Sequence, residues 1–195
     1  MRILKWQGKR CSWFMNKTPK HHKNIITRQL PKTGQTVEYQ AGDDGTYEAG
    51  WWKGRLNSNN KVRFVSKTIG GDVVVIDRAT GLMWAADGNA AGCNLGGVST
   101  WSFAVTYAEA LTFAGFTDWR LPNVKELMSI VNYSKTLSSI DEPPFSNTGS
   151  NIFWTSTTYR QLTTSAWRIA FTFGSVAANA KSDPFGSLRC VRGGV

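Results

Sequence analysis

The stretch Thr-Asp-Trp-Arg-Leu-Pro-Asn-Val-Lys-Glu-Leu, residues 117–127, places a helix start directly after an aromatic and a cationic side chain. Pro122 fixes its own φ and favours extended geometry at Leu121. Asn123 can cap a helix, and Glu126 three residues later completes a capping-box pattern. The apolar residues that follow have the spacing of a buried helical face: Val124, Leu127, Met128 and Val131.

A β-hairpin and another helix are predicted upstream of this stretch. Asp-Val-Val-Val-Ile-Asp, residues 72–77, has the composition of a strand, and a turn at 78–81 leads into a return strand at 82–86. Thr100 can cap a helix, and Gly115 is a natural end for it. The apolar face of that helix would consist of Trp101, Ala104, Val105, Ala108 and Leu111.

The C-terminal part of the chain consists of apolar runs separated by turn residues. Four predicted strands occupy residues 151–158, 166–173, 176–182 and 187–193. Gly174 and Ser175 supply a turn between the second and the third. Two helices placed among antiparallel strands predict an α+β domain with antiparallel sheets.

The excess of positive charge lies in the N-terminal part of the chain. The 195 residues carry a formal charge of +10, yet residues 1–32 hold nine Lys or Arg and no acid. The remainder holds 14 basic and 13 acidic side chains, which argues against nucleic acid as a partner of the fold itself. We expect residues 1–30 to be a poorly ordered basic arm; the alternative is an arm that contacts nucleic acid, anionic lipid or a virion component.

Two further segments follow this arm. Residues 69–195 are expected to form the main domain, a ligand-binding domain. No secretory signal and no run long enough to span a membrane is visible, so the localisation stays open. Residues 31–68 predict a small lead-in segment packed by its aromatic side chains: Tyr39, Tyr47, Trp51 and Trp52.

Three cysteines cannot all pair within one chain. Cys93 lies in a Gly-rich loop, Cys190 lies near the C-terminus, and Cys11 lies in the basic arm. One interpretation is a disulfide between Cys93 and Cys190 that ties the last strand to the body of the fold; the other is three reduced thiols. No Cys and His residues stand at zinc spacing, so no metal ligand set is predicted.

The residue patterns of catalytic sites are missing from the main domain. No His follows His22, which excludes His-based triads and His metal sites there. We interpret Asp118 and Arg120 as an ion pair at the helix start, and Asp141 and Glu142 as solvated loop residues. The chain is therefore expected to bind a ligand without a cofactor, rather than to act as an enzyme.

Three groups of residues resemble the Lcl C-terminal domain family, named for the C-terminal domain of collagen-like bacterial adhesins. They are Thr-Gly-Leu-Met-Trp at 80–84, Asp-Trp-Arg-Leu-Pro-Asn at 118–123 and Arg-Cys-Val-Arg-Gly-Gly at 189–194, and the resemblance covers about residues 70–195. The resemblance implies a C-type lectin-like fold. The scaffold residues that it implies are Trp84, Trp119, Arg120, Pro122, Trp154 and Trp167.

The resemblance also bears on cysteines and cofactors. Many members have a Cys in the first helix where this chain has Ala108, which favours Cys93 as the partner of Cys190. The loop and strand motifs that bind calcium and sugar in animal lectins have no counterpart, so no metal is implied. The paired active-site cysteines of formylglycine-generating enzymes, which share the fold, have no counterpart either.

Residues 167–192 resemble the variable region of diversity-generating retroelement targets. In those proteins an RNA template is copied with errors at adenine, so AAY codons for Asn become NNY codons, which exclude Lys, Glu, Gln, Met and Trp. Every position that looks variable here carries an NNY residue, and Lys181 falls where related sequences keep Lys. The frame between the variable positions would be Trp167, Phe171, Gly174 and Val176.

Strand alternation predicts which of these side chains are exposed. Trp167, Ile169 and Phe171 would face the core, while the alternate residues would face out with an exposed loop at 177–187. The Gly at 186 also falls among the positions that look variable. The predicted binding face consists of Arg160, Arg168, Ala170, Thr172, Phe173, Ser175, Ala177, Ala178, Asn179, Ser182, Asp183, Phe185 and Ser187.

The resemblance thus implies a receptor-recognition protein of a phage, virus or cell surface, with a surface protein or glycan as its ligand. Homo-oligomers are common among adhesins and tail proteins with this fold, so an oligomer is compatible with it. The first alternative is a fixed adhesin domain that binds sulfated polysaccharide, against which the nearly neutral main domain argues. The second is an oxidoreductase of the formylglycine-generating type, which would require a reactive cysteine pair.

Overall fold

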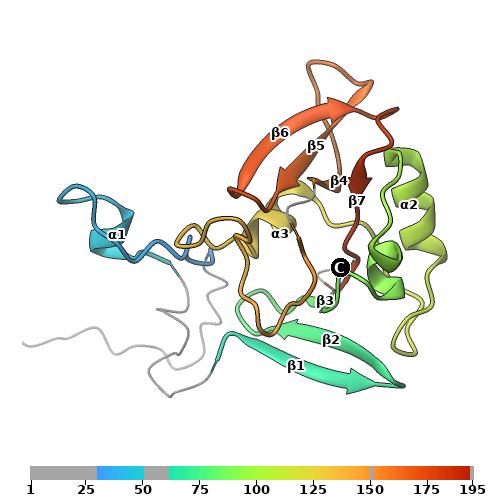
Figure 1. The fold of residues 1–195 in the computed structure, drawn as a ribbon, viewed down its shortest axis with the longest axis horizontal. Helices are drawn as coiled ribbons and strands as arrows, with labels where there is room; N and C mark the ends of the chain where they lie inside the picture. Colours follow the sequence, from blue (N-terminus) through green and yellow to red (C-terminus); the bar gives the residue numbers. More distant parts are fainter. Residues whose placement is uncertain (1–29, 51–61, 150–151, 194–195) are drawn as a thin grey trace, which may run out of the picture.

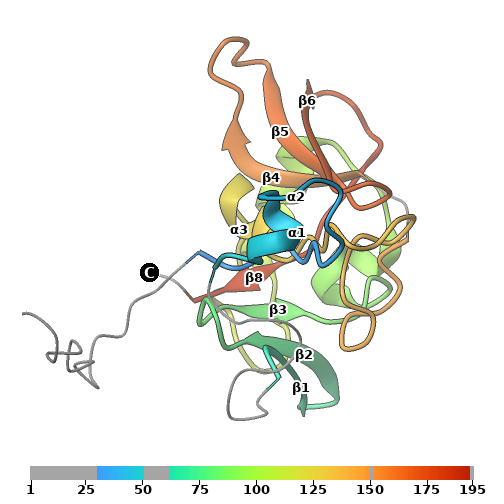
Figure 2. The ribbon, with the colours of Figure 1, turned by 90° about the vertical axis from the view of Figure 1, so that its left-hand side faces the viewer.

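The computed structural model describes residues 30–50, 62–149 and 152–193 (Figure 1). Its strands form two sheets at opposite ends of the main domain, with the longer helices between them and at their side (Figures 1 and 2). This mixture of helices and sheets confirms the predicted α+β class. The predicted arm, residues 1–30, lies almost entirely outside the described residues.

The first sheet has the order β1-β2-β3-β8 and is antiparallel throughout. The predicted hairpin is confirmed as β2 (Asp72–Asp77) and β3 (Met83–Ala85), and β8 (Val191–Arg192) pairs with β3. β1 (Phe64–Ile69) pairs along its whole length with β2. The sheet therefore begins within the segment predicted as the lead-in. The sequence did not predict β1, because an edge strand whose side chains are exposed or half-buried has no clear hydrophobic pattern.

The second sheet has the order β6-β5-β4-β7. β4 (Ile152–Thr158), β5 (Ser165–Ala170) and β6 (Ser175–Ala180) are antiparallel neighbours. β7 (Gly186–Ser187) pairs with β4 in parallel, so the prediction of wholly antiparallel sheets was wrong for this pair.

The last apolar run was predicted as one strand at 187–193, and this was wrong. The run crosses from β7 in the second sheet to β8 in the first, and the three residues between are fully buried. Arg189 is one of them: its guanidinium donates hydrogen bonds to the carbonyl oxygens of Ala85 (2.6 Å) and Ala86 (2.7 Å) and to Thr148 Oγ1 (2.9 Å). The crossing therefore joins the two sheets through the core.

Two helices follow their predicted starts. In α2 (Trp101–Ala110) the Thr100 side chain accepts from the backbone N–H of Phe103. The helix ends at Ala110 and not at Gly115, because Leu111 is extended and the chain turns so that Leu111 enters the core. Ala104 and Ala108 on its predicted face are fully buried.

The capping box predicted for the opening stretch is present in α3 (Val124–Ser129). Asn123 and Glu126 each accept a hydrogen bond from the other's backbone N–H. Leu127 and Val131 are buried as expected, but Met128 is 39% exposed because the helix is only six residues long and its last turn leaves the core. The remaining helical segments are short: α1 (Asp44–Tyr47) in the lead-in and the 3₁₀ segment η1 (Ala91–Gly96).

The ion pair expected between Asp118 and Arg120 is not formed. The Arg120 guanidinium instead donates two hydrogen bonds of 2.7 Å to the Glu126 carboxylate, because the capping box turns Glu126 back over the helix start. A β-bridge between Arg120 and Val191 brings Arg192 beside Asp118, and these two side chains pair at 2.7 Å. The hydrogen bonds from Arg192 lower the pKa of the Asp118 carboxyl below its usual value.

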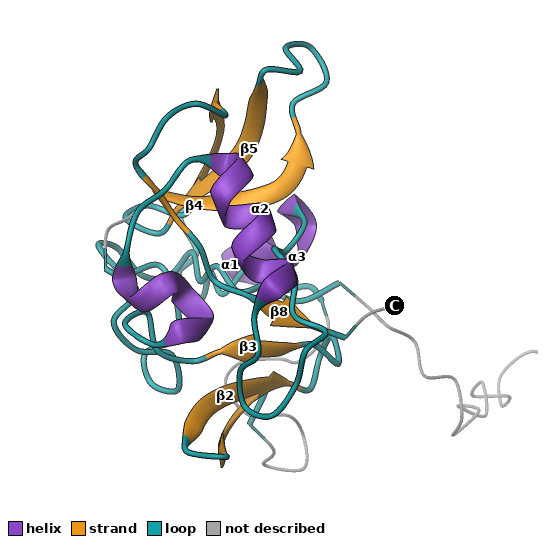
Figure 3. Ribbon diagram, turned by 90° about the vertical axis from the view of Figure 1, so that its right-hand side faces the viewer, coloured by secondary structure: helices purple, strands orange, loops and turns teal. Residues whose placement is uncertain are grey.

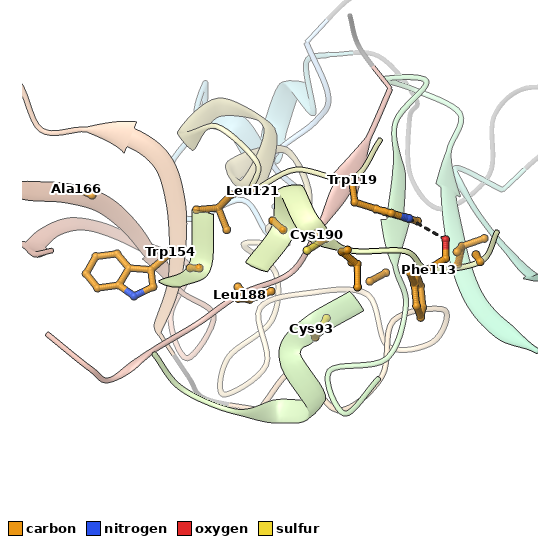
Figure 4. Packing of buried hydrophobic residues seen from close by; sticks show 14 residues of the cluster. Cys93, Phe113, Trp119, Leu121, Trp154, Ala166, Leu188 and Cys190 are labelled. Atoms are coloured by element: carbon orange, nitrogen blue, oxygen red, sulfur yellow. Dashed lines mark hydrogen bonds between the residues drawn. The ribbon is translucent and has the colours of Figure 1, made fainter. Parts of the chain in front are cut away.

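The scaffold tryptophans lie in two hydrophobic clusters. Trp119 and Trp154 belong to the cluster that α2 covers, and the Trp119 indole donates to the Phe113 carbonyl oxygen at 2.9 Å (Figure 4). Trp84 belongs to the second cluster, which lies against α3. Pro122 is also buried, so the tryptophans at 84, 119 and 154 and this proline have scaffold positions.

Cys93 and Cys190 are free thiols in one buried cluster (Figure 4). The backbone N–H of Cys190 donates to the Gly92 carbonyl oxygen at 2.9 Å, which places the two segments side by side. Burial raises the pKa of both thiols. A disulfide between them stays a prediction about the oxidised protein.

Candidate binding face

The candidate face is built on β5 and β6, which pair over six residues each. Directly opposed residues of an antiparallel pair share one side of the sheet. Arg168 opposes Ala177, and Ala170 opposes Ser175, so these four side chains lie on one side. Ala178 opposes Trp167 on the other side, so the predicted residues do not all share one side of the sheet.

A chain of polar contacts connects three predicted residues from two elements. Arg168 Nε donates to Asn179 Oδ1 at 2.9 Å, and Asn179 Nδ2 donates to Asp183 Oδ2 at 3.1 Å. All three side chains are half-buried. The register of β5 and β6, together with the turn that follows β6, therefore positions a cationic, an amide and an acidic group side by side in the absence of a ligand.

Two phenylalanines mark the ends of this surface. Phe173 is 67% exposed beside the turn between β5 and β6, and Phe185 is 69% exposed just before β7. Large apolar side chains with so much exposed area have no role in the core of the domain. Aromatic anchors of this kind carry much of the binding energy in protein interfaces.

The structure removes three positions from the exposed surface. Ala170 is only 9% exposed and Ser187 only 3%, so the expectation that they face solvent was wrong. Both pair with the first residues of β4, where Phe153 is buried in the core. A Cβ atom on Gly186 would lie 2.0 Å from Trp154 Nε1, so this position cannot accept a side chain without displacing a buried indole.

The other predicted residues are at least partly accessible. The predicted loop at 177–187 is wrong for its first residues, because 177–180 belong to β6. Half-buried or exposed side chains are found at Arg160, Thr172, Ser175, Ala177, Ala178 and Ser182.

The predicted frame residues have the contacts of a scaffold. Ile169 and Phe171 are fully buried as expected, whereas Trp167 is half-buried and packs edge-on against Tyr159 with ring centroids 5.0 Å apart. Gly174 has a φ of +67°, and a Cβ atom there would lie 2.7 Å from Val131 Cγ1. This turn therefore requires glycine on two grounds.

Lys181 is a structural residue whose contacts the sequence did not reveal. Its Nζ lies 4.1 Å from the centroid of the Trp101 ring and donates to Thr158 Oγ1 at 2.9 Å. Its backbone N–H donates to the Thr164 carbonyl oxygen, and its own carbonyl oxygen accepts from the backbone N–H of Trp101. These contacts tie the segment after β6 to the start of α2, which packs against β4 (Figure 3). The Trp101 indole could not be predicted as a partner because 80 residues separate the two positions.

Metal and membrane features are limited in the described parts of the chain. Within residues 30–50, 62–149 and 152–193, no group of three or more His, Cys, Asp or Glu is arranged to hold a metal ion. No helix of these segments is both long and apolar enough to cross a bilayer.

Comparison with known proteins supports the resemblance seen in the sequence motifs. No curated protein matches the chain. The family model of the Lcl C-terminal domain matches residues 73–192, which is more than half of the chain and includes both sheets except β1. The chain therefore belongs to the Lcl C-terminal domain family.

Proposed function

We propose that this chain is a non-enzymatic recognition protein that presents a diversified binding face on a C-type lectin-like scaffold. Its ligand is a protein or glycan on a cell surface, as suits a phage, a virus or a surface adhesin. The face consists of half-buried or exposed positions on β5, on β6 and on the segment that follows, and the sheet beneath it is anchored in the core.

The observation that carries this proposal is the division of roles along residues 167–187. Lys181, the only Lys of the run, is held by the Trp101 ring and by Thr158. Phe171 is fully buried and Gly174 has no room for a side chain. Lys181, Phe171 and Gly174 are residues that diversification would leave unchanged, and they make contacts within the scaffold. Most of the other side chains of this run are accessible at the surface.

The chemistry of binding follows from the contacts of the face. Arg168 is already oriented by Asn179, so binding costs less side-chain entropy than it would for a free arginine. Phe173 and Phe185 would pack into hollows of the partner. Residue types that NNY codons encode, such as Tyr and Ser, can replace Arg168, Phe173 and Phe185 without changing the core. The same scaffold can therefore present faces for different ligands.

The decisive test is made on the DNA. The locus of this gene is sequenced and searched for a near-copy of the codons for residues 160–192 beside a reverse transcriptase gene. We expect a copy that differs only at adenines, with no difference at the codon of Gly186 because of the indole beneath it. A locus without a copy and without a reverse transcriptase would refute diversification; a glycan array that includes sulfated polysaccharides would then test the fixed adhesin.

A further inference from the structure

A pocket of about 480 Å³ lies away from the candidate face, between the lead-in and the main domain. Its walls come from residues 32–36, from the start of β1 and from the loops at 130–135 and 141–144. The lead-in is attached here by a 2.9 Å hydrogen bond from the backbone N–H of Tyr133 to the Thr33 carbonyl oxygen. The volume is in the range of small-molecule sites, and no residue of the candidate face lines it.

The described cationic side chains that line this pocket are all paired with carboxylates. Among the described lining residues three are cationic and three are anionic: Lys32, Arg63, Lys135, Glu48, Asp141 and Glu142. Lys32 pairs with Glu48, and Lys135 lies 3.5 Å from Asp141. Arg63 is held by Asp77 behind the wall. Each of these cations is already paired with a carboxylate, so an anionic ligand would find no unpaired positive charge among them and would also face the Glu142 carboxylate, which favours an uncharged ligand over an anion.

Hydrogen-bonding groups of both kinds are still available in the pocket. Asp141 Oδ1 accepts from Asn132 Nδ2 at 2.8 Å, and Glu142 Oε1 accepts from the Thr148 backbone N–H at 3.1 Å. The second oxygen of each carboxylate has no donor among the residues that the structure describes. Lys135 Nζ donates to the Ile140 carbonyl oxygen and has further N–H groups to give. Fixed acceptors beside an ammonium suit a ligand whose groups both donate and accept, as hydroxyls do.

Apolar surface completes the site. The described lining includes two adjacent prolines, Pro143 and Pro144, next to the carboxylates, and the Phe64 ring, one face of which is covered by the Arg63 guanidinium at 4.4 Å from the centroid. Flat apolar surfaces of this kind pack against the C–H face of a sugar ring, while its hydroxyls reach the polar groups. We propose that this pocket binds a neutral saccharide of one or two rings, with Asp141 and Glu142 as the hydroxyl acceptors. The proposal is independent of the diversified face.

The test uses the full chain and ligand-observed NMR with five probes: glucose, galactose, mannose, maltose and lactose. We expect saturation transfer to at least one of them, and about tenfold weaker binding of that sugar by the double variant Asp141→Asn/Glu142→Gln. Glu109→Gln removes the charge of an exposed carboxylate on α2 that lines neither the pocket nor the candidate face, and it should leave the affinity unchanged. Glucuronate, an anionic analogue, should bind more weakly than glucose.

A second variant covers the case in which the double variant fails to fold. Thr36 is exposed on the rim of the pocket, and its side chain forms no hydrogen bond within the described segments. Thr36→Trp should therefore fill the pocket and abolish transfer while the fold survives. Transfer to none of the five sugars would overturn the proposal. Transfer that persists in Thr36→Trp, or that Glu109→Gln weakens as much as the pocket variants do, would overturn it as well.

Discussion

Gly186→Ala is the substitution whose cost the structure defines most sharply. The added methyl group would lie 2.0 Å from Trp154 Nε1, 2.4 Å from Cδ1 and 2.5 Å from Cε2. The indole cannot move away freely, because Trp154 is 1% exposed and its Nε1 donates to the Ser99 carbonyl oxygen at 2.9 Å. Either the ring or β7 must shift.

The magnitude follows from two contributions. Forcing an extra methyl group into a packed core costs about 1–3 kcal/mol. Losing the indole hydrogen bond and leaving the buried N–H unpaired costs about 1 kcal/mol more. We therefore expect Gly186→Ala to lower the free energy of unfolding by about 2–4 kcal/mol, which for a domain of this size lowers Tm by roughly 5–15 °C.

The assay is urea unfolding followed by tryptophan fluorescence, with thermal unfolding by circular dichroism as a second measurement. Gly115→Ala is the control: a Cβ atom there would have no described atom within 4 Å but φ is +75°, so only backbone strain of about 1 kcal/mol is expected. In a Trp154→Phe background the cost of Gly186→Ala should shrink, because Nε1, the ring atom nearest to the added methyl group, is gone. A cost of Gly186→Ala no larger than that of Gly115→Ala would refute the reasoning, and position 186 could then vary.

Three other outcomes are expected. Lys181→Ala should lower the free energy of unfolding by about 1 kcal/mol through loss of its cation–π contact, whereas Lys125→Ala on an exposed helix surface should not. Because the pKa of Asp118 is lowered in the folded protein, its carboxylate stabilises the fold above the unfolded-state pKa, and this contribution is lost as the pH falls through the folded-state pKa. In the Asp118→Asn variant the urea midpoint should therefore fall less steeply below about pH 4 than in the unchanged protein. An equal slope in both proteins would contradict this. Because burial raises the pKa of Cys93 and Cys190, reduced protein whose third cysteine is replaced by serine should react with a maleimide only after unfolding; rapid labelling in native buffer would contradict their burial.

Much of the secondary structure was predictable because its signals are local. Asn123 and Glu126 lie three residues apart, so a capping box can be recognised without knowing the rest of the fold. The strand predicted at 72–77 has the bounds of β2, since a run of Val and Ile followed by a turn identifies a hairpin. The family could also be recognised, because three motifs occur in their expected order.

The candidate face was predictable only in part. Alternation placed Ile169 and Phe171 in the core, since a strand has a period of two. The same rule failed at Ala170, and the expectation of an exposed loop failed at Ser187, because both residues pair with β4, where successive residues on both sides of the strand are buried. Alternation shows which side of a strand a residue occupies, and only the packing of other elements decides whether that side is open.

The sequence by itself determined where α2, α3 and β2 begin, the caps at Thr100 and Asn123, and to which family the chain belongs. Only the tertiary structure decided that Arg120 pairs with Glu126, that Arg192 pairs with Asp118, and that the last run joins two sheets. The physical reason is range. Caps, turns and strand periods depend on neighbours within a few residues, whereas ion-pair partners and burial depend on groups that only the packed fold brings together.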